Sequence, residues 1–447
     1  MRRAAAANAL RLGSAAQDRQ TLRNRPEVAT EMTQDRPPLA APDEPLDWRC
    51  KGLLTGPSGR LSRDSVVGVS ILDGPFSWPL LTLQASAVEH NIAALAGFCA
   101  DRGVELAPHV KTTMAPSLIR LQLAAGACAL TVATAYQLQV LRRLGARRVV
   151  VANELVDPRA LRWLAAELAA DEGFECCFYV DSVDGVAAAA SAAGERPFRV
   201  LVEVGFAGGR TGCRDEDSVA AVARAAVAAG LEVVGVAGFE GMLPDERAVR
   251  GLLARLRSAA LLLHGTALLS PAEPAIVSAG GSAWFDVVAD ELTTGWPGGM
   301  AVRPLLRSGC YVGHDDGVYA ATTPYAERIP SAGSLRPALR LWAQVLSTPE
   351  PGLALVGFGK RDASFDAGFP VPLEVRGAGG VRRSAAGLEV VRLDDQHAYL
   401  TVAGAGVAVG EVVRFGISHP CTVFDRWSTI PLVDDEERVL DVLRTYF

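Results

Sequence analysis

Lysine is scarce in this sequence: Lys51, Lys111 and Lys360 are its only three, although lysine and arginine together number 44. Arginine therefore supplies the positive surface charge, and a lysine placed at a strand end stands out as a chemical group. Neither positive nor negative charge is concentrated in one part of the sequence. The formal net charge is -6 without a basic stripe or an acidic tail, which argues against nucleic acid and anionic membrane surfaces as partners. No apolar run reaches the ~20 residues that a membrane span needs.

Cysteine spacing excludes two further classes of protein. The chain is too long to need disulfide staples, and the spacings do not fit a zinc finger. We expect most of the cysteines to be small buried side chains of a protein in the reducing cytoplasm. The adjacent pair in "ECCFYVD" should point to opposite faces of a strand. The eight positions are Cys50, Cys99, Cys128, Cys176, Cys177, Cys213, Cys310 and Cys421.

The chain divides into four parts by pattern. Residues 1–45 are rich in alanine and arginine, and we interpret them as a disordered extension in preference to an organelle transit peptide. Residues 46–78 lead into the folded sequence. Between 79 and 312, short apolar runs such as "RVVVANEL" and "FRVLVEVGF" alternate with alanine-rich helical patterns. Residues 313–447 carry short alternating runs split by glycine and proline, which predict an antiparallel β-domain that the segment 46–78 could join.

The alternating part predicts parallel strands covered by helices. Eight such units over about two hundred residues match a (β/α)₈ barrel of the TIM type, so the fold class is α/β with an appended antiparallel β-domain. A doubly wound open sheet stays possible, although no Gly-x-Gly-x-x-Gly follows an early strand. Periodicity also leaves open whether "LLTLQ" or the later "LLRSGCYVG" supplies one of the eight strands.

Two features at predicted strand ends indicate a cofactor site. Lys111 follows the run "VELAPHV", at the end of a barrel where catalytic residues gather, and a desolvated lysine there is a competent amine nucleophile. The stretch "SAGGSAW" follows what we count as the last barrel strand and is typical of a phosphate-binding turn. Together they predict pyridoxal phosphate, held covalently and through its phosphate. Arg210 follows another strand and could face the ring nitrogen. Lys51 is expected at the surface, and Lys360 is the rival to Lys111.

These motifs, taken in order, resemble a known family. "PHVKTT", "VEVGFAGGRTG", "SAGGS", "LRSGCYVGHD" and "HPCTVFDRW" are similar to motifs of the fold-type III pyridoxal phosphate enzymes, in the D-serine dehydratase and D-threonine aldolase family with its alanine-racemase-like barrel. The resemblance runs from about Trp78 to the C-terminus. It implies that Lys111 binds the cofactor and exchanges protons at the substrate Cα. It also implies a set of cofactor contacts, namely His109 and Arg210 at the ring and Ser278, Gly280 and Gly281 at the phosphate, with Thr134 and Tyr311 nearby.

The same resemblance gives a role to His419 and Cys421 near the C-terminus. In the family a His-x-Cys or His-x-Asp pair from the β-domain binds a divalent metal at the barrel mouth. We expect the two residues on a strand, where positions i and i+2 face the same side. Imidazole and thiolate suit Zn²⁺, whereas a carboxylate would suit a harder ion such as Mn²⁺. Without Lys111, a coincidental pair in a buried strand would be the better interpretation.

The cysteine of the pair favours one reaction. In the family the His-x-Cys form resembles the dehydratases, so the expected activity is a lyase that converts D-serine or a related β-hydroxy D-amino acid to a keto acid and ammonia. D-threonine aldolase is the alternative, and a non-catalytic pyridoxal-binding protein is a further one. A racemase would not use His419 and Cys421 as a metal pair. The resemblance implies a homodimer with a small-molecule substrate and with neither nucleic acid nor membrane as partner.

Overall fold

A computed structural model describes residue 39, residues 44–404 and residues 406–447 of the chain. The expected extension over residues 1–45 lies almost entirely outside these described residues. Within them, no helix combines the length and the apolar character that crossing a membrane requires.

Eight parallel strands form one curled sheet. From β5 to β11, each strand pairs with the next strand along the chain. The first strand, β4, pairs with the last, β11. The seam between β4 and β5 is closed by a parallel bridge between His109 and Thr131 and by the Cys128 amide, which donates to the Leu106 carbonyl at 2.9 Å. The predicted (β/α)₈ barrel is therefore confirmed. Its strands are β4 (Glu105–Leu106), β5 (Leu130–Val132), β6 (Arg148–Glu154), β7 (Glu175–Val180), β8 (Arg199–Val204), β9 (Glu232–Gly238), β10 (Ala275–Ala279) and β11 (Val302–Leu306).

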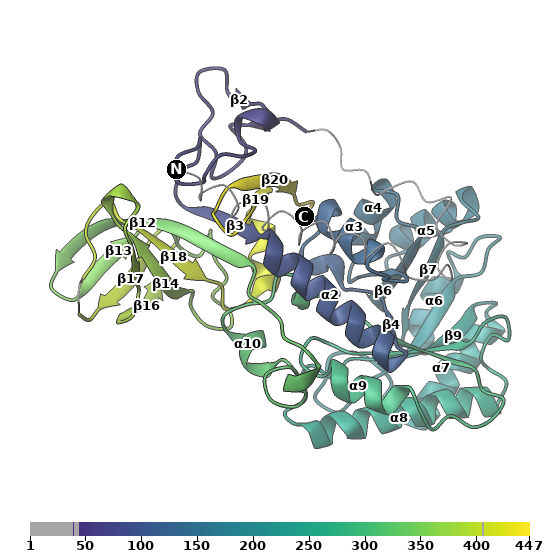
Figure 1. The fold of residues 1–447 in the computed structure, drawn as a ribbon. Helices are drawn as coiled ribbons and strands as arrows, with labels where there is room; N and C mark the ends of the chain where they lie inside the picture. Colours follow the sequence, from purple (N-terminus) through teal and green to yellow (C-terminus); the bar gives the residue numbers. More distant parts are fainter. Residues whose placement is uncertain (1–38, 40–43, 405) are drawn as a thin grey trace, which may run out of the picture. The chain divides into compact units, whose positions relative to one another are not determined.

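Helices cover the outside of this sheet (Figure 1). Several begin where a strand-end loop supplies a capping side chain, because Asp, Ser and Thr accept the free amides of a first helical turn. Asp215 does so for α7 together with Ser218, and Asp245 does so for α8. The helices are α2 (Ala85–Arg102), α3 (Pro116–Ala124), α4 (Ala135–Arg143), α5 (Pro158–Ala170), α6 (Val183–Ala190), α7 (Glu216–Ala228), α8 (Glu246–Gly265) and α9 (Phe285–Leu292); α10 (Val318–Thr322) follows the barrel.

The barrel strands bury both of their faces, which explains why they are apolar throughout. Val150, Tyr179, Leu201 and other side chains fill the inside of the barrel, in a cluster separate from the larger core beneath the helices. Cys177 belongs to the inner cluster and Cys176 to the outer one, as the strand alternation predicts. Both are buried free thiols.

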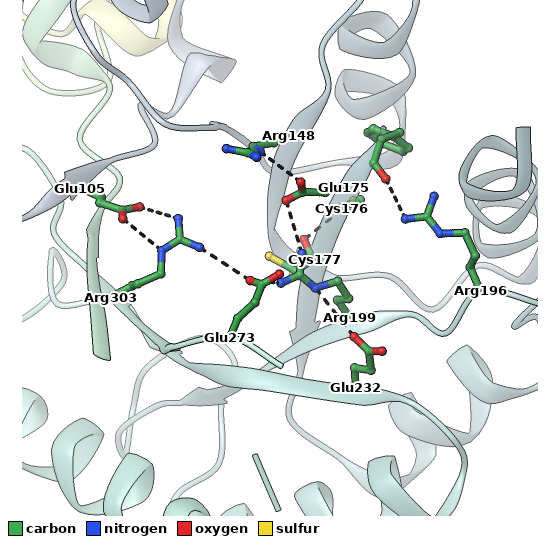
Figure 2. Close-up of polar contacts among 11 residues, drawn as sticks. Glu105, Arg148, Glu175, Cys176, Cys177, Arg196, Arg199, Glu232, Glu273 and Arg303 are labelled. Carbon is green, nitrogen blue, oxygen red and sulfur yellow. Dashed lines mark hydrogen bonds and ion pairs between the residues drawn. The ribbon is translucent and has the colours of Figure 1, made fainter. Parts of the chain in front are cut away.

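Alternating charges form an incomplete ring at the end of the barrel where the strands begin (Figure 2). Arg199, on the first position of β8, is 2.7 Å from Glu273, 3.5 Å from Glu175 and 4.0 Å from Glu232. Further ion pairs continue the ring, namely Arg303 with Glu105 and Glu273, and Arg148 with Glu175. Since this face of a barrel carries stability and not chemistry, the ring leaves the opposite end free for a site.

Ten further strands form a second sheet that is antiparallel, as the alternating runs predict, except for the parallel pair of β19 and β3. Its centre is the long strand β12 (Leu339–Glu350), which pairs with β18 (Val412–Gly416) on one side and with β13 (Leu353–Val356) and β3 (Leu80–Gln84) elsewhere along its length. The other members are β14 (Val371–Arg376), β15 (Arg382–Ser384), β16 (Leu388–Leu393), β17 (Ala398–Val402), β19 (Thr429–Val433) and β20 (Val439–Arg444).

The position of β3 settles which apolar run joins the barrel. The run "LLTLQ" is β3, which pairs with β12 and β19 in the antiparallel sheet, while "LLRSGCYVG" begins within β11. The glycine turn "SAGGS" consequently follows the seventh barrel strand and not the last one. Upstream, residues 46–78 contain β1 (Leu46–Asp47) and β2 (Arg60–Leu61) and pack against Trp342 and Val439 of this sheet.

Candidate active site

A cavity of about 260 Å³ opens at the end of the barrel where the strands stop. Five of the residues predicted from sequence line it: His109, Lys111, Arg210, Gly280 and Gly281. The other lining residues are Ala133, Ala152, Asn153, Tyr179, Glu203, Thr211, Phe239 and Arg307. The volume lies just below the range of roughly 300–1,000 Å³ that is usual for small-molecule pockets.

Lys111 lies in a single 3-10 turn, Val110–Thr112, that follows β4. The turn is pressed against the loop after β11, because a Cβ on Gly309 would lie 2.2 Å from the His109 carbonyl oxygen. Only glycine therefore allows this approach. Lys111 is the one lysine that lines the cavity. Lys360 is exposed, with its ammonium 5.8 Å from the Phe365 ring centre.

Lys51 differs from its expected surface position. Its ammonium lies 3.2 Å from the buried Asp362 carboxylate and 3.8 Å from the centre of the Trp427 ring. Burial lowers the pKa of Lys51, and the charge of Asp362 opposes that shift. The side chain thus fastens the segment 46–78 to the β-domain.

His109 is held as a neutral imidazole. Burial, followed by the positive charges of Lys111, Arg307 and Arg210, lowers its pKa well below the usual value. Its Nδ1 lies 3.2 Å from the Thr131 carbonyl oxygen, which can only accept a hydrogen bond. Nδ1 therefore carries the proton, and Nε2 has a free lone pair.

The glycine turn after β10 is an anion-binding turn. The amides of Gly280 and Gly281 donate to the two carboxylate oxygens of Glu240, at 3.1 and 2.5 Å. Gly280 has φ of 99°, a conformation that favours glycine. Ser278, predicted to contact the phosphate, is used inside the barrel instead: its hydroxyl donates to the Leu305 carbonyl at 2.9 Å and accepts from Arg307.

Two arginines supply positive charge to the cavity. Arg210 is exposed, and its guanidinium lies 4.7 Å from the Phe239 ring centre. Arg307 is buried, donates to the Gly238 carbonyl at 2.7 Å and lies 5.7 Å from the Tyr179 ring centre. The sequence reasoning missed Arg307. The sequence does contain a pattern that could have identified it, since "LLRSG" places an arginine at the end of a barrel strand, just before a glycine turn.

Two predicted residues lie away from the cavity. Thr134 caps helix α4, where its hydroxyl accepts the Gln137 amide at 3.2 Å. Tyr311 is buried on the helix side of the barrel, and its hydroxyl accepts from Gln122 at 2.9 Å. Both side chains have structural partners that account for them.

Three carboxylates converge beside the cavity, and sequence reasoning did not single them out. Glu154, Asp181 and Glu203 stand at or just past the ends of three adjacent strands, with one oxygen of each within 4.8 Å of the others. Burial, followed by the hydrogen bond and charge of Glu203 and the charge of Asp181, raises the pKa of Glu154 to about 8. Glu154 therefore stays protonated at neutral pH, which avoids three adjacent negative charges.

His419 and Cys421 do not lie on a strand, contrary to expectation. Strand β18 ends at Gly416, and the two residues flank Pro420 at the start of a 3-10 turn, Pro420–Thr422. Proline has no amide proton to continue a strand ladder, which explains the difference. The turn brings the Cys421 Sγ to 3.7 Å from the hydroxyl of Thr112, the residue next to Lys111.

The imidazole of His419 is oriented by a carboxylate. Its Nδ1 lies 2.7 Å from Asp366, whose second oxygen accepts the Thr422 hydroxyl at 2.8 Å. A histidine that binds a metal commonly has its other ring nitrogen held in this way, so Nε2 of His419 and the Cys421 sulfur form a donor set that fits zinc. Among the described residues only the three carboxylates form a group of three possible ligands within 4.8 Å, so His419 and Cys421 belong to no such group in this structure.

A second thiol contacts Cys421. The Cys310 Sγ lies 2.9 Å from the Cys421 Sγ, and both sulfurs are near the Thr112 hydroxyl. The hydrogen bond from Cys421 is the main cause that lowers the pKa of Cys310 to about 6, against the effect of burial. The pKa of Cys421 is raised correspondingly. Cys310 is thus the more acidic of the two thiols.

Comparisons with known proteins match both parts of the chain. Residues 83–298 match the alanine racemase N-terminal domain, and residues 338–433 match the family described as "Putative serine dehydratase domain". No curated protein sequence matches the chain.

Solved structures share this fold over most of the chain. D-threonine aldolase from Filomicrobium marinum has a TM-score of 0.71 and 23% identity, over 85% of this chain and 97% of that one. D-threo-3-hydroxyaspartate dehydratase from Delftia sp. HT23 has a TM-score of 0.65 and 23% identity, over 83% and 97%. Alanine racemase from Bacillus anthracis has a TM-score of 0.56 and 17% identity, over 82% and 97%. At these identities the likeness establishes a shared fold.

Proposed function

The chain belongs to the fold-type III pyridoxal phosphate enzymes, and from that premise we propose that it is a metal-dependent lyase that deaminates D-serine or a related β-hydroxy D-amino acid. The observation that carries this proposal is the contact between Thr112 and Cys421. It brings the Cys421 thiol to 3.7 Å from the residue next to the cavity lysine, which supports a metal bound by His419 and Cys421 beside the cofactor. A substrate whose amine takes the place of Lys111 on the cofactor would therefore have its β-hydroxyl on the side of a metal held by His419 and Cys421.

The cavity fits pyridoxal phosphate. Lys111 is the amine that would hold it, and the amides of Gly280 and Gly281 already converge on one anion, the Glu240 carboxylate, in the place where a phosphate would bind. The cofactor, when bound, supplies an electron sink for the carbanion at the substrate Cα. Glu240 would have to give up these amides to the phosphate.

The side chains around the cavity then have separate tasks. Lys111 would remove the Cα proton, and the positive charges of Arg210 and Arg307 would favour anionic groups in the cavity. Neutral His109 would accept a hydrogen bond at Nε2 without adding charge. His419 and Cys421 would hold zinc, which supplies a Lewis acid for the departing β-hydroxyl. The products would be a keto acid and ammonia.

One assay separates this proposal from its alternatives. Purified protein with pyridoxal phosphate and D-serine should form pyruvate and ammonia, and a metal chelator should abolish both products, with zinc restoring them. D-threonine serves as the second substrate. Glycine and acetaldehyde from D-threonine, without pyruvate from D-serine, would overturn the deaminase proposal in favour of an aldolase.

The aldolase remains the second candidate because of a specific likeness. The D-threonine aldolase structure shares 85% of this chain at a TM-score of 0.71, comparable with the dehydratase. The thiol of Cys421 favours the deaminase, since a thiolate selects zinc over harder ions. If neither substrate is consumed while the cofactor binds to Lys111, a non-catalytic pyridoxal-binding protein becomes the better explanation.

A further inference from the structure

Two thiols meet where the loop after β11 contacts the turn after β18. The sulfurs of Cys310 and Cys421 are 2.9 Å apart although 111 residues separate them in the chain. Both cysteines are free. Cys310 is 7% exposed, and its short 3-10 turn, Cys310–Val312, is fixed by the close approach of Gly309 to His109. The pair is therefore held in place by the backbone of two separate segments.

The surroundings of these sulfurs are polar. The Thr112 hydroxyl is 3.7 Å from one sulfur and 4.0 Å from the other. A cysteine that only fills space packs against apolar atoms, as Cys176 does in the core beneath the helices. Hydroxyl donors around sulfur are instead what a thiolate needs when it binds a cation.

The distance between the sulfurs is compatible with a shared metal ion. Two thiolates bound to zinc at about 2.3 Å in a tetrahedral arrangement are separated by about 3.7 Å. The two sulfurs would need to part by only about 0.8 Å, which a small side-chain rotation provides.

The third donor comes from the same turn as Cys421. The His419 ring lies 6.0 Å from the ring of Tyr319, which belongs to the segment that follows Cys310. Because Asp366 holds Nδ1, the lone pair of His419 is on Nε2. The His419 nitrogens and the two sulfurs are not all within 4.8 Å of one another in this structure, so the His419 side chain has to turn toward the sulfurs to complete the site.

We propose that Cys310 is a third protein ligand of the metal, which makes the site His419, Cys421 and Cys310. This inference rests on the proposed function for the location of the metal pair. Three protein ligands and an open fourth position are the usual composition of a catalytic zinc site. Two thiolates also restrict the metal to a thiophilic ion such as Zn²⁺, and disfavour Mn²⁺.

The number of thiolates on the metal can be counted directly. The full-length protein with its cofactor is stripped of metal by a chelator, kept in a phosphine reductant so that no disulfide forms, and titrated with Co²⁺. The intensity of the sulfur-to-cobalt charge-transfer band reports how many thiolates bind. We expect Cys310→Ser and Cys421→Ser each to lose about half of the wild-type intensity, and zinc affinity to fall at least roughly tenfold. Cys176→Ser, which removes a thiol far from the site, should change neither.

Each outcome has a distinct meaning. An unchanged band in Cys310→Ser, together with a loss in Cys421→Ser, would overturn the three-ligand site while leaving the proposed function intact. Absence of any band in the wild-type protein would show that His419 and Cys421 bind no metal, and would overturn the proposed metal-dependent function as well. If the serine variant does not fold, as judged by its circular dichroism, Cys310→Ala replaces it. X-ray absorption of the zinc-loaded wild-type protein gives an independent count, with two sulfurs expected and one sulfur contradicting the proposal.

Discussion

Glu240 and Gly281 are joined by a short hydrogen bond: the carboxylate accepts the Gly281 amide at 2.5 Å, while its other oxygen accepts the Gly280 amide at 3.1 Å. Both amides belong to the turn that the sequence marks as a phosphate site. A buried carboxylate on those amides is an internal competitor for any anion that binds there.

Replacement of Glu240 by glutamine should strengthen cofactor binding. The neutral amide accepts more weakly from Gly280 and Gly281, so the phosphate displaces it at a lower cost, and we expect the dissociation constant of pyridoxal phosphate to fall about tenfold. Fluorescence titration of the cofactor-free protein measures it. Glu246→Gln, on the surface of α8, is the matched control. Weaker binding in E240Q would show that Glu240 supports the turn and does not compete for it.

Lys111→Ala should remove both the visible absorbance of lysine-bound cofactor and the deaminase activity. Loss of a group that transfers a proton reduces the rate by at least roughly 100-fold. Lys360→Ala, which removes an exposed lysine outside the cavity, should leave absorbance and rate unchanged. Retention of the absorbance band in K111A would mean that another amine holds the cofactor.

Asp366→Asn should weaken metal binding without altering the ligands themselves. The carboxylate orients the His419 ring through Nδ1 at 2.7 Å, and the loss of such a partner lowers metal affinity by roughly 10- to 100-fold. Competition with a chromogenic chelator measures the affinity. The control is Asp395→Asn, since Asp395 pairs only with exposed Arg361. Equal affinities in the two variants would contradict the positioning role of Asp366.

The pKa of Glu154 predicts a pH dependence of stability. Its pKa rises from 4.5 to about 8 on folding. Between these values the folded state holds a proton that the unfolded state has lost, so the stabilisation is fully present below about pH 4.5 and is lost as the pH rises through 8. Glu154→Gln should flatten the fall in melting temperature between pH 5 and 8, whereas exposed Glu350→Gln should not. A parallel fall in E154Q and wild type would assign the dependence to other groups.

Removal of Arg199 should destabilise the barrel without affecting its chemistry. Arg199→Met leaves three carboxylates without their shared cation, and we expect the free energy of unfolding to fall by about 1–3 kcal/mol. The loss should shrink in 1 M salt, because screening weakens both attraction and repulsion. Cofactor affinity should stay constant, since the ring lies at the opposite end of the barrel. Arg159→Met, which breaks one exposed pair, should change stability little.

Short sequence motifs were enough to predict those site residues that lie on a single strand or in the loop that follows it. Lys111 and the glycines 280 and 281 line the cavity because a strand-end position is visible in a short stretch of sequence. Arg307 follows the same logic but was overlooked, because its strand was one of two candidates for the barrel. Once β3 is assigned to the antiparallel sheet, β11 and its arginine follow.

Features that depend on several strands could not be found in this way. Glu154, Asp181 and Glu203 are separated by more than twenty residues from one another and meet only because three parallel strands stop at the same level. The meeting of Cys310 and Cys421 depends on how a barrel loop contacts the β-domain. The resemblance to a family placed Cys421 near Lys111, but the turn that achieves it follows from Pro420, which prevents the strand that alternation alone suggested.

The pairing of β3 with β12 and β19 has a consequence for how the chain is assembled. The antiparallel sheet takes one strand from before the barrel and the others from after it, so the barrel is an insertion between two strands of a single sheet. A ribosome must complete the barrel before β3 can find either partner. If the gene were cut between the two domains, β3 would remain on the barrel fragment without its partner strands. Its unpaired edge would then promote aggregation. A circular permutation that places β3 after β20 would instead keep all strands of the second sheet together and leave the barrel intact.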